Sequence, residues 1–163
     1  MVPFAIFNRF GRTYPTVRGF FSALRRNEAS SLPLGAVGFC WGGKHVALLA
    51  GDPEGQKLID AAFTGHPSML DVPADIKKVR VPVSIAVGDK DNWLSVKQAE
   101  QVKEIVEALP DESRGEVVIY PGCGHGFCVR ADHLNEDVAK QASEAEDQCI
   151  RWFEKHFGSD TTA

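Results

Sequence analysis

The stretch that decides the fold is Gly38-Phe39-Cys40-Trp41-Gly42-Gly43, where a cysteine stands between glycines two residues before and two residues after it. The apolar run Leu34–Phe39 before it indicates a buried strand, and the nearly all-apolar Lys44–Ala50 after it indicates a buried helix. Glycines at these two positions let strand and helix approach closely around a nucleophile held in a tight turn. The alternative interpretation is a glycine-rich turn with a buried structural cysteine.

If Cys40 is a nucleophile, the helix behind it has chemical consequences. The positive potential at a helix N-terminus favours a thiolate. The backbone N–H of Trp41 is placed to stabilise an oxyanion. The indole of Trp41 either forms a wall of a substrate pocket or packs against the neighbouring helix.

The rest of the chain alternates between short apolar strands and amphipathic helices. Further strands are predicted at Ile59–Phe63, Val79–Val87 and Glu116–Tyr120. Helices are predicted from Thr13 or Tyr14 to Asn27 (with Pro15 in the first turn), over Val96–Leu109 and over Glu136–Phe157. The alternation predicts an α/β protein with a mainly parallel sheet of about four strands flanked by helices. In such a sheet, functional residues collect at the carboxyl ends of the strands.

Helical periodicity also predicts which side chains face the core. Three of the predicted helices are each expected to bury one apolar face. In the first helix this face consists of Val17, Phe20, Phe21 and Leu24, and in the helix over Val96–Leu109 it consists of Ala99, Val102, Ile105, Val106 and Leu109. In the last helix it consists of Val138, Ala142, Ala145, Cys149 and Trp152 or Phe153.

Two further strand ends carry polar residues. Gly88-Asp89-Lys90-Asp91 follows the third strand, and either acid can orient a catalytic imidazole and stabilise its charged form. An ordinary polar turn is the alternative. Gly122-Cys123-Gly124-His125-Gly126-Phe127 follows the fourth strand, and its three glycines indicate a loop with unusual backbone angles and a close neighbour. The alternative there is a surface histidine.

Four segments together resemble the dienelactone hydrolase family, above all its fungal members. They are Gly-Phe-Cys-Trp-Gly-Gly-Lys (38–44), Phe-Thr-Gly-His-Pro-Ser (63–68), Ser-Ile-Ala-Val-Gly-Asp-Lys-Asp (84–91) and Tyr-Pro-Gly-Cys-Gly-His-Gly-Phe (120–127). The likeness runs from about Tyr14 to Phe157, and the order nucleophile, acid, histidine is that of α/β hydrolases.

This resemblance implies a partial α/β-hydrolase fold and a triad of Cys40, Asp91 and His125 that cleaves an ester or lactone through an acyl-enzyme. The family motif Gly-x-x-Asp, counted from Gly88, selects Asp91 over Asp89, although Ser95 stands where the family often has proline. No metal and no organic cofactor is implied.

In bacterial relatives an arginine shortly after the histidine binds the substrate carboxylate. Its nearest counterpart here is Arg130, whose spacing from His125 differs from the family pattern by one residue. Trp41 is the other candidate for substrate contact.

The resemblance also sets an expectation about length. Family members usually have the nucleophile near the middle of a longer chain, whereas 39 residues precede Cys40 here. We therefore expect the first strands and a second oxyanion donor to be missing, and the strand before Cys40 to be an exposed edge prone to self-association. The chain is then either part of a hydrolase or a catalytically impaired binding or assembly module.

Composition limits the remaining possibilities. The chain has 163 residues, 44% of them hydrophobic, and a formal net charge of −4, which fits a single domain over 1–163 with a frayed tail at 158–163. The acidic balance argues against nucleic acid as a partner. No apolar run suits a membrane span, and the N-terminus lacks the features of a secretory signal. We expect a cytoplasmic protein with a small-molecule partner.

The cysteines and the remaining histidine motif need separate interpretation. In a reducing compartment the four cysteines are expected to be free thiols, with a reversible Cys123–Cys128 disulfide as an alternative. Cys123 and Cys128 flank His125, but this spacing is not that of a zinc site, so no metal is expected. Cys149 is expected to be a core thiol, and His66 a structural turn residue rather than an acid or base.

Overall fold

The computed structural model describes residues 8–52 and 57–158. Its sheet has four parallel strands in the order β1 (Gly35–Phe39), β2 (Ala61–Gly65), β3 (Val83–Lys90) and β4 (Glu116–Gly124). The helices are α2 (Phe10–Arg26), α3 (Trp41–Ala50), α4 (Val96–Glu107) and α5 (Glu136–Phe157), with a short 3-10 helix η1 (Ile76–Lys78). The predicted α/β class is confirmed. The tail expected to fray lies outside the described residues, apart from Gly158.

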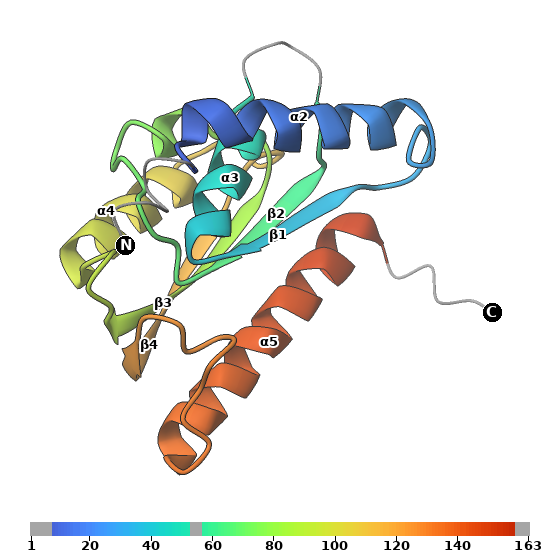
Figure 1. Ribbon diagram of the computed structural model, residues 1–163. Coiled ribbons are helices and arrows are strands. Elements are labelled where there is room, and N and C mark those ends of the chain that lie inside the picture. Colours follow the sequence, from blue (N-terminus) through green and yellow to red (C-terminus); the bar gives the residue numbers. More distant parts are fainter. Residues whose placement is uncertain (1–7, 53–56, 159–163) are drawn as a thin grey trace.

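Helices cover both faces of the sheet (Figure 1), with α2, α3 and α4 on one side and α5 on the other. Side chains alternate along each strand, so Ile85 and Val87 pack into the core under α3 and α4, while Ala86 packs into the smaller core under α5. Both faces are therefore apolar, as expected of a parallel sheet. No helix within the described ranges is both long and apolar enough to cross a bilayer.

Several boundaries differ from the sequence prediction for local reasons. Helix α2 begins at Phe10, so Pro15 lies inside the helix rather than in its first turn. Strand β3 begins at Val83 rather than at Val79, because Pro82 has no N–H to donate to the ladder. Strands β2 and β4 run on to Gly65 and Gly124, which carries both closer to the carboxyl edge.

The predicted faces of α4 and α5 are buried or partly buried, whereas the predicted face of α2 is at most partly buried. Phe20 was expected to face the core but is 59% exposed. Helix α2 packs mainly on α3, and that narrow contact covers Val17 and Phe21 without reaching Phe20. The inward faces of α4 and α5 are as predicted, with Val102 and Ala145 fully enclosed.

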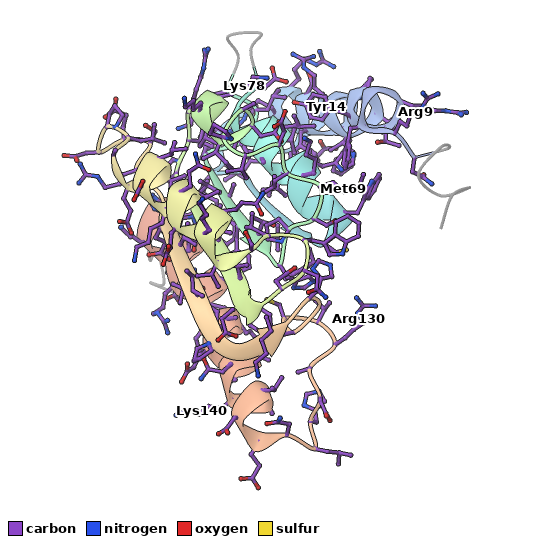
Figure 2. The ribbon with its side chains drawn as sticks, turned by 90° about the vertical axis from the view of Figure 1, so that its left-hand side faces the viewer. Arg9, Tyr14, Met69, Lys78, Arg130 and Lys140 are labelled. Atoms are coloured by element: carbon purple, nitrogen blue, oxygen red, sulfur yellow. The ribbon has the colours of Figure 1, made fainter. Side chains whose placement is uncertain are left out.

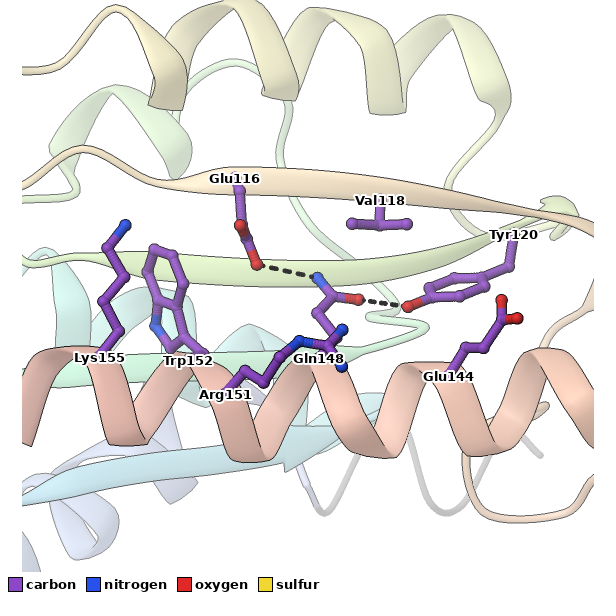
Figure 3. A pocket seen from close by; sticks show the side chains of 8 residues that line it. All are labelled: Glu116, Val118, Tyr120, Glu144, Gln148, Arg151, Trp152 and Lys155. Carbon is purple, nitrogen blue, oxygen red and sulfur yellow. Dashed lines mark hydrogen bonds between the residues drawn. The ribbon is translucent and has the colours of Figure 1, made fainter. Parts of the chain in front are cut away.

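A buried glutamine joins α5 to the sheet (Figure 3). The Gln148 amide donates to Ser84 Oγ at 2.8 Å and to Glu116 Oε1 at 3.5 Å, and its oxygen accepts from the Tyr120 hydroxyl at 2.8 Å. This network lines a hollow of about 380 Å³ between β4 and α5, which also contains Trp152. None of Cys40, Asp91 and His125 lines the hollow. The network therefore positions α5 and does not belong to the predicted site.

The glycines around the β1–α3 turn divide into those that the packing requires and one that it does not. A Cβ on Gly38 would lie 2.6 Å from Gly42 O, and a Cβ on Gly43 would collide with Thr64 Oγ1 and lie 2.8 Å from Pro67 Cβ. A Cβ on Gly42 meets nothing within 4 Å. The close approach thus needs glycine two residues before and three residues after Cys40, and the prediction of a steric need two residues after it was wrong.

This distinction predicts opposite effects for two neighbouring substitutions. Gly43→Ala should lower the free energy of unfolding by about 1–3 kcal/mol, because the new methyl group collides with β2 and the loop after it. Gly42→Ala should leave stability unchanged or raise it by up to about 1 kcal/mol, since alanine favours the helix. Urea unfolding of both variants checks the prediction, and equal losses would contradict it.

Candidate active site

Three strand ends bring the predicted residues together. Cys40 is the N-cap residue of α3 directly after β1, Asp91 follows β3, and His125 follows β4. Because the three strands are parallel, their carboxyl ends share one edge of the sheet. Residues separated by as many as 85 positions in the sequence therefore meet there.

The three side chains form a continuous chain of contacts. His125 Nε2 lies 3.0 Å from Cys40 Sγ, and His125 Nδ1 lies 3.0 Å and 3.1 Å from the two Asp91 carboxylate oxygens. Asp91 is buried and accepts hydrogen bonds from the backbone N–H groups of Trp93, at 2.7 Å, and Leu94, at 3.4 Å. Asp89, the competing acid, is exposed to solvent. The geometry thus favours the aspartate that the family motif selects.

The Cys40 backbone is held in a conformation that non-glycine residues rarely adopt, with φ of 52° and ψ of −120°. Hydrogen bonds hold it there, because its N–H donates to Gly65 O at 3.2 Å and its carbonyl accepts from Gly43 N at 3.1 Å and Ser68 N at 2.9 Å. Such strain persists where the surroundings fix it, and it often marks a functional position. Here the Cys40 thiol lies 3.0 Å from the His125 imidazole.

The loop after β2 also reaches the site, which the sequence interpretation did not foresee for Ser68. Ser68 Oγ lies 3.7 Å from Cys40 Sγ. The His66 ring is fully buried, with ring centroids 5.1 Å from His125 and 5.8 Å from Phe39. Burial, together with the nearby His125, lowers the pKa of His66 to about 4, so this ring is neutral at physiological pH. The available signal was the position of this segment in the sequence, because residues 66–68 directly follow a predicted strand, as the other site segments do.

The two candidates for substrate contact lie in different surroundings. The Trp41 indole packs between Phe10 and His45, with ring centroids 5.8 Å and 4.2 Å away, which favours the packing interpretation for this side chain. Its backbone N–H belongs to the first turn of α3, directly beside Cys40. The Arg130 guanidinium lies over Gly126, because a Cβ added to this glycine would be 3.0 Å from Arg130 Nη2. The Arg130 side chain extends outward from the body of the protein (Figure 2).

Trp93 is a residue near the site that sequence reasoning missed. It follows Asp91 by two residues, its side chain is 50% exposed, and its ring centroid lies 6.2 Å from that of His125. An aromatic residue in the loop that holds the acid was the available signal. Trp93 therefore presents an apolar surface beside the imidazole.

The other three cysteines differ from Cys40 in their environment. Burial raises the pKa of Cys128 to about 12 and of Cys149 to about 11, and it also raises the pKa of Cys123. These thiols are protonated at neutral pH. All four cysteines lie in the described residues as free thiols, and within those residues no group of three or more His, Cys, Asp or Glu side chains is arranged to hold a metal.

Residues 17–157 of this chain match the dienelactone hydrolase family. Among curated proteins, Hydrolase tropI of Talaromyces stipitatus is 30% identical over 133 residues, covering 80% of this chain and 49% of that protein. Hydrolase pyvD of Aspergillus violaceofuscus is 30% identical, covering 76% and 47% respectively. A putative carboxymethylenebutenolidase of Escherichia coli K12 is 26% identical, covering 82% and 50%. The chain spans about half the length of these relatives.

Solved structures show the same fold. A putative dienelactone hydrolase from Klebsiella pneumoniae superposes with a TM-score of 0.67 at 22% identity, covering 87% of this chain and 60% of that one. The α/β hydrolase MGS-M1 from a deep-sea metagenome library superposes with a TM-score of 0.63 at 15% identity, covering 84% and 61%. The predicted α/β-hydrolase architecture is confirmed, and the chain belongs to the dienelactone hydrolase family.

Proposed function

We propose that this chain carries the reacting residues of a hydrolase that cleaves an ester or lactone bond, with Cys40 as nucleophile, His125 as base and Asp91 as the acid that orients the imidazole. The observation that carries the proposal is the unbroken line of contacts at 3.0–3.1 Å from thiol to imidazole to buried carboxylate. Relatives named as hydrolases and carboxymethylenebutenolidases support the same class of reaction.

The geometry fits a two-step acyl transfer. His125 Nε2 takes the proton from Cys40 Sγ, and the thiolate attacks the carbonyl carbon of the substrate. The bond between that carbon and the leaving oxygen breaks, and His125 returns its proton to the departing alkoxide, which leaves a thioester. Water, deprotonated by His125, then releases the acid and restores the thiol. Asp91 holds the imidazole in the tautomer that each step requires.

Backbone and surface groups complete the proposed site. The Trp41 N–H stabilises the oxyanion of the tetrahedral intermediate, and the Arg130 guanidinium binds a carboxylate on the substrate. No metal or organic cofactor enters these steps. A cysteine nucleophile needs a reduced thiol, and this requirement supports a cytoplasmic location for the proposed enzyme.

The test of this proposal is hydrolysis of a nitrophenyl ester by the purified chain. Cys40→Ala should lower kcat/KM by about 10³-fold or more, because the reaction loses its nucleophile. Cys149→Ala is the matched control, since it removes a protonated thiol of α5 and should retain the rate of the unmodified chain. Equal rates for the unmodified chain and Cys40→Ala would contradict the proposed activity.

The role of Arg130 makes a separate prediction about substrate charge. Arg130→Gln should raise KM about tenfold for an ester that carries a carboxylate on its acyl group, because a charged hydrogen bond is lost. KM for the uncharged ester of the same size should stay within about twofold. Steady-state kinetics with the two esters checks this, and equal effects on both would assign Arg130 no part in recognition of the carboxylate.

A second candidate function, an assembly module, is favoured by the free side of β1. Within the described residues β1 pairs with β2 alone, and Val37 on this strand is 49% exposed. Ile150 on α5 is exposed as well, beside the hollow that Phe39 and Cys149 line. Unpaired strand edges with apolar side chains are templates for further strands. We propose that two copies of this chain associate through their β1 edges.

Sedimentation velocity tests this association. The unmodified chain should form dimers or larger species at micromolar concentration, and Val37→Lys should shift it to monomer, because a lysine on an edge strand opposes pairing. Val129→Lys, a matched change at a half-exposed valine outside the sheet, should leave the distribution unchanged. A monomeric unmodified chain would contradict the proposal.

A further inference from the structure

We propose that the Ser68 hydroxyl is a second hydrogen-bond donor to the Cys40 thiolate, in addition to His125. The inference rests on the proposed function in one respect, which is that Cys40 is the nucleophile. Ser68 lies 28 residues beyond Cys40 in the sequence, yet Ser68 Oγ lies 3.7 Å from Cys40 Sγ. This distance is within the range of a hydrogen bond to sulfur, whose atomic radius exceeds that of oxygen.

The backbone fixes the position of Ser68 independently of its side chain. Ser68 N–H donates to the Cys40 carbonyl at 2.9 Å, and Cys40 N–H donates to Gly65 O at 3.2 Å. The N–H of the intervening His66 donates to Ala86 O at 2.7 Å. The loop from Gly65 to Ser68 is therefore attached to the nucleophile turn on one side and to β3 on the other. The hydroxyl stands next to the sulfur whether the thiol is charged or neutral.

The protonation state of the sulfur decides the direction of this hydrogen bond. A neutral thiol can donate or accept, but a thiolate can only accept. When His125 has taken the thiol proton, the Ser68 O–H can donate to the sulfur beside the imidazolium. The Ser68 residue is 3% exposed, so water has little access to replace that donor. A hydrogen bond to a charged, poorly solvated atom is worth more than one between neutral groups.

The other charged or titratable groups that the structure describes near Cys40 do not contact its sulfur directly. Asp91 acts on the sulfur through His125, and the pKa of His66, lowered to about 4 by burial, leaves that ring neutral above pH 5. On α3, Lys44 is paired with Asp75 at 2.5 Å. Within residues 8–52 and 57–158, the side-chain groups at hydrogen-bonding distance from the Cys40 sulfur are thus the imidazole of His125 and the hydroxyl of Ser68.

The experiment is the pH profile of Cys40 alkylation by iodoacetamide in the full chain, followed by mass spectrometry of the Cys40 peptide. Ser68→Ala should move the pH of half-maximal rate upward by about one unit, which is about a tenfold loss of rate on the acidic side of the midpoint. Ser68→Thr keeps a hydroxyl and should restore most of the original profile. Circular dichroism verifies that each variant is folded, and Ser68→Gly removes the same hydroxyl if the alanine variant does not fold.

Thr64→Val is the matched control. Thr64 Oγ1 is also buried in the neighbouring strand end, and it has no hydrogen-bond partner among the described residues. Its removal should leave the alkylation midpoint unchanged, since this hydroxyl does not contact the sulfur. Unchanged midpoints for both Ser68→Ala and Thr64→Val would overturn the proposal, and so would equal shifts, which would assign the effect to loop packing.

Alkylation separates this inference from the proposed function. The reagent measures the thiolate itself and needs no ester turnover. A chain that hydrolyses no ester but shows the Ser68→Ala shift supports the thiolate contact and contradicts the hydrolase activity. A chain that hydrolyses esters through Cys40 but shows no Ser68→Ala shift supports the hydrolase activity and contradicts the thiolate contact.

Discussion

The strained turn at Cys40 is the constraint on which the site depends. A positive φ at a non-glycine residue is costly, so the neighbouring chain must hold it in place. Here that restraint comes from Gly65 O at the end of β2, from Ser68 N in the loop after it, and from the close approach that Gly38 and Gly43 permit. Strand β2 contributes none of the side chains of Cys40, Asp91 and His125, yet the position of Cys40 depends on it. The parallel register then brings the ends of β3 and β4 to the same edge.

The sequence allowed much of this arrangement to be predicted, for a physical reason that particular residues illustrate. Each of the three site residues, Cys40, Asp91 and His125, directly follows an apolar strand. Because the carboxyl ends of parallel strands share one edge of the sheet, local sequence patterns were enough to predict that these residues lie close together. The choice between Asp89 and Asp91 depended on a family motif. The structure supports that choice because Asp91 is buried. The sequence of a polar turn does not indicate which of its two acids is buried.

What the sequence did not reveal depends on contacts between elements. The need for glycine at position 43 rather than 42 arises from Thr64 and Pro67, which only the folded chain brings to α3. Phe20 follows the apolar stripe of α2 but is left exposed, because periodicity indicates a helix face and not the width of the surface that covers it. Ser68 was missed because nothing in the Pro-Ser sequence indicates that its hydroxyl lies beside the Cys40 thiol in the folded chain.

The burial of His66 beside His125 has a consequence for acid tolerance. In the folded chain the pKa of this ring is about 4, whereas an unfolded chain returns it to about 6.5. As the pH falls from about 6.5 towards 4, the unfolded state binds a proton that the folded state excludes, so folding free energy is lost across that interval. The loss amounts to about 3 kcal/mol for this single ring. A histidine that packs against the His125 imidazole thus makes the stability of the fold around the site depend on near-neutral surroundings.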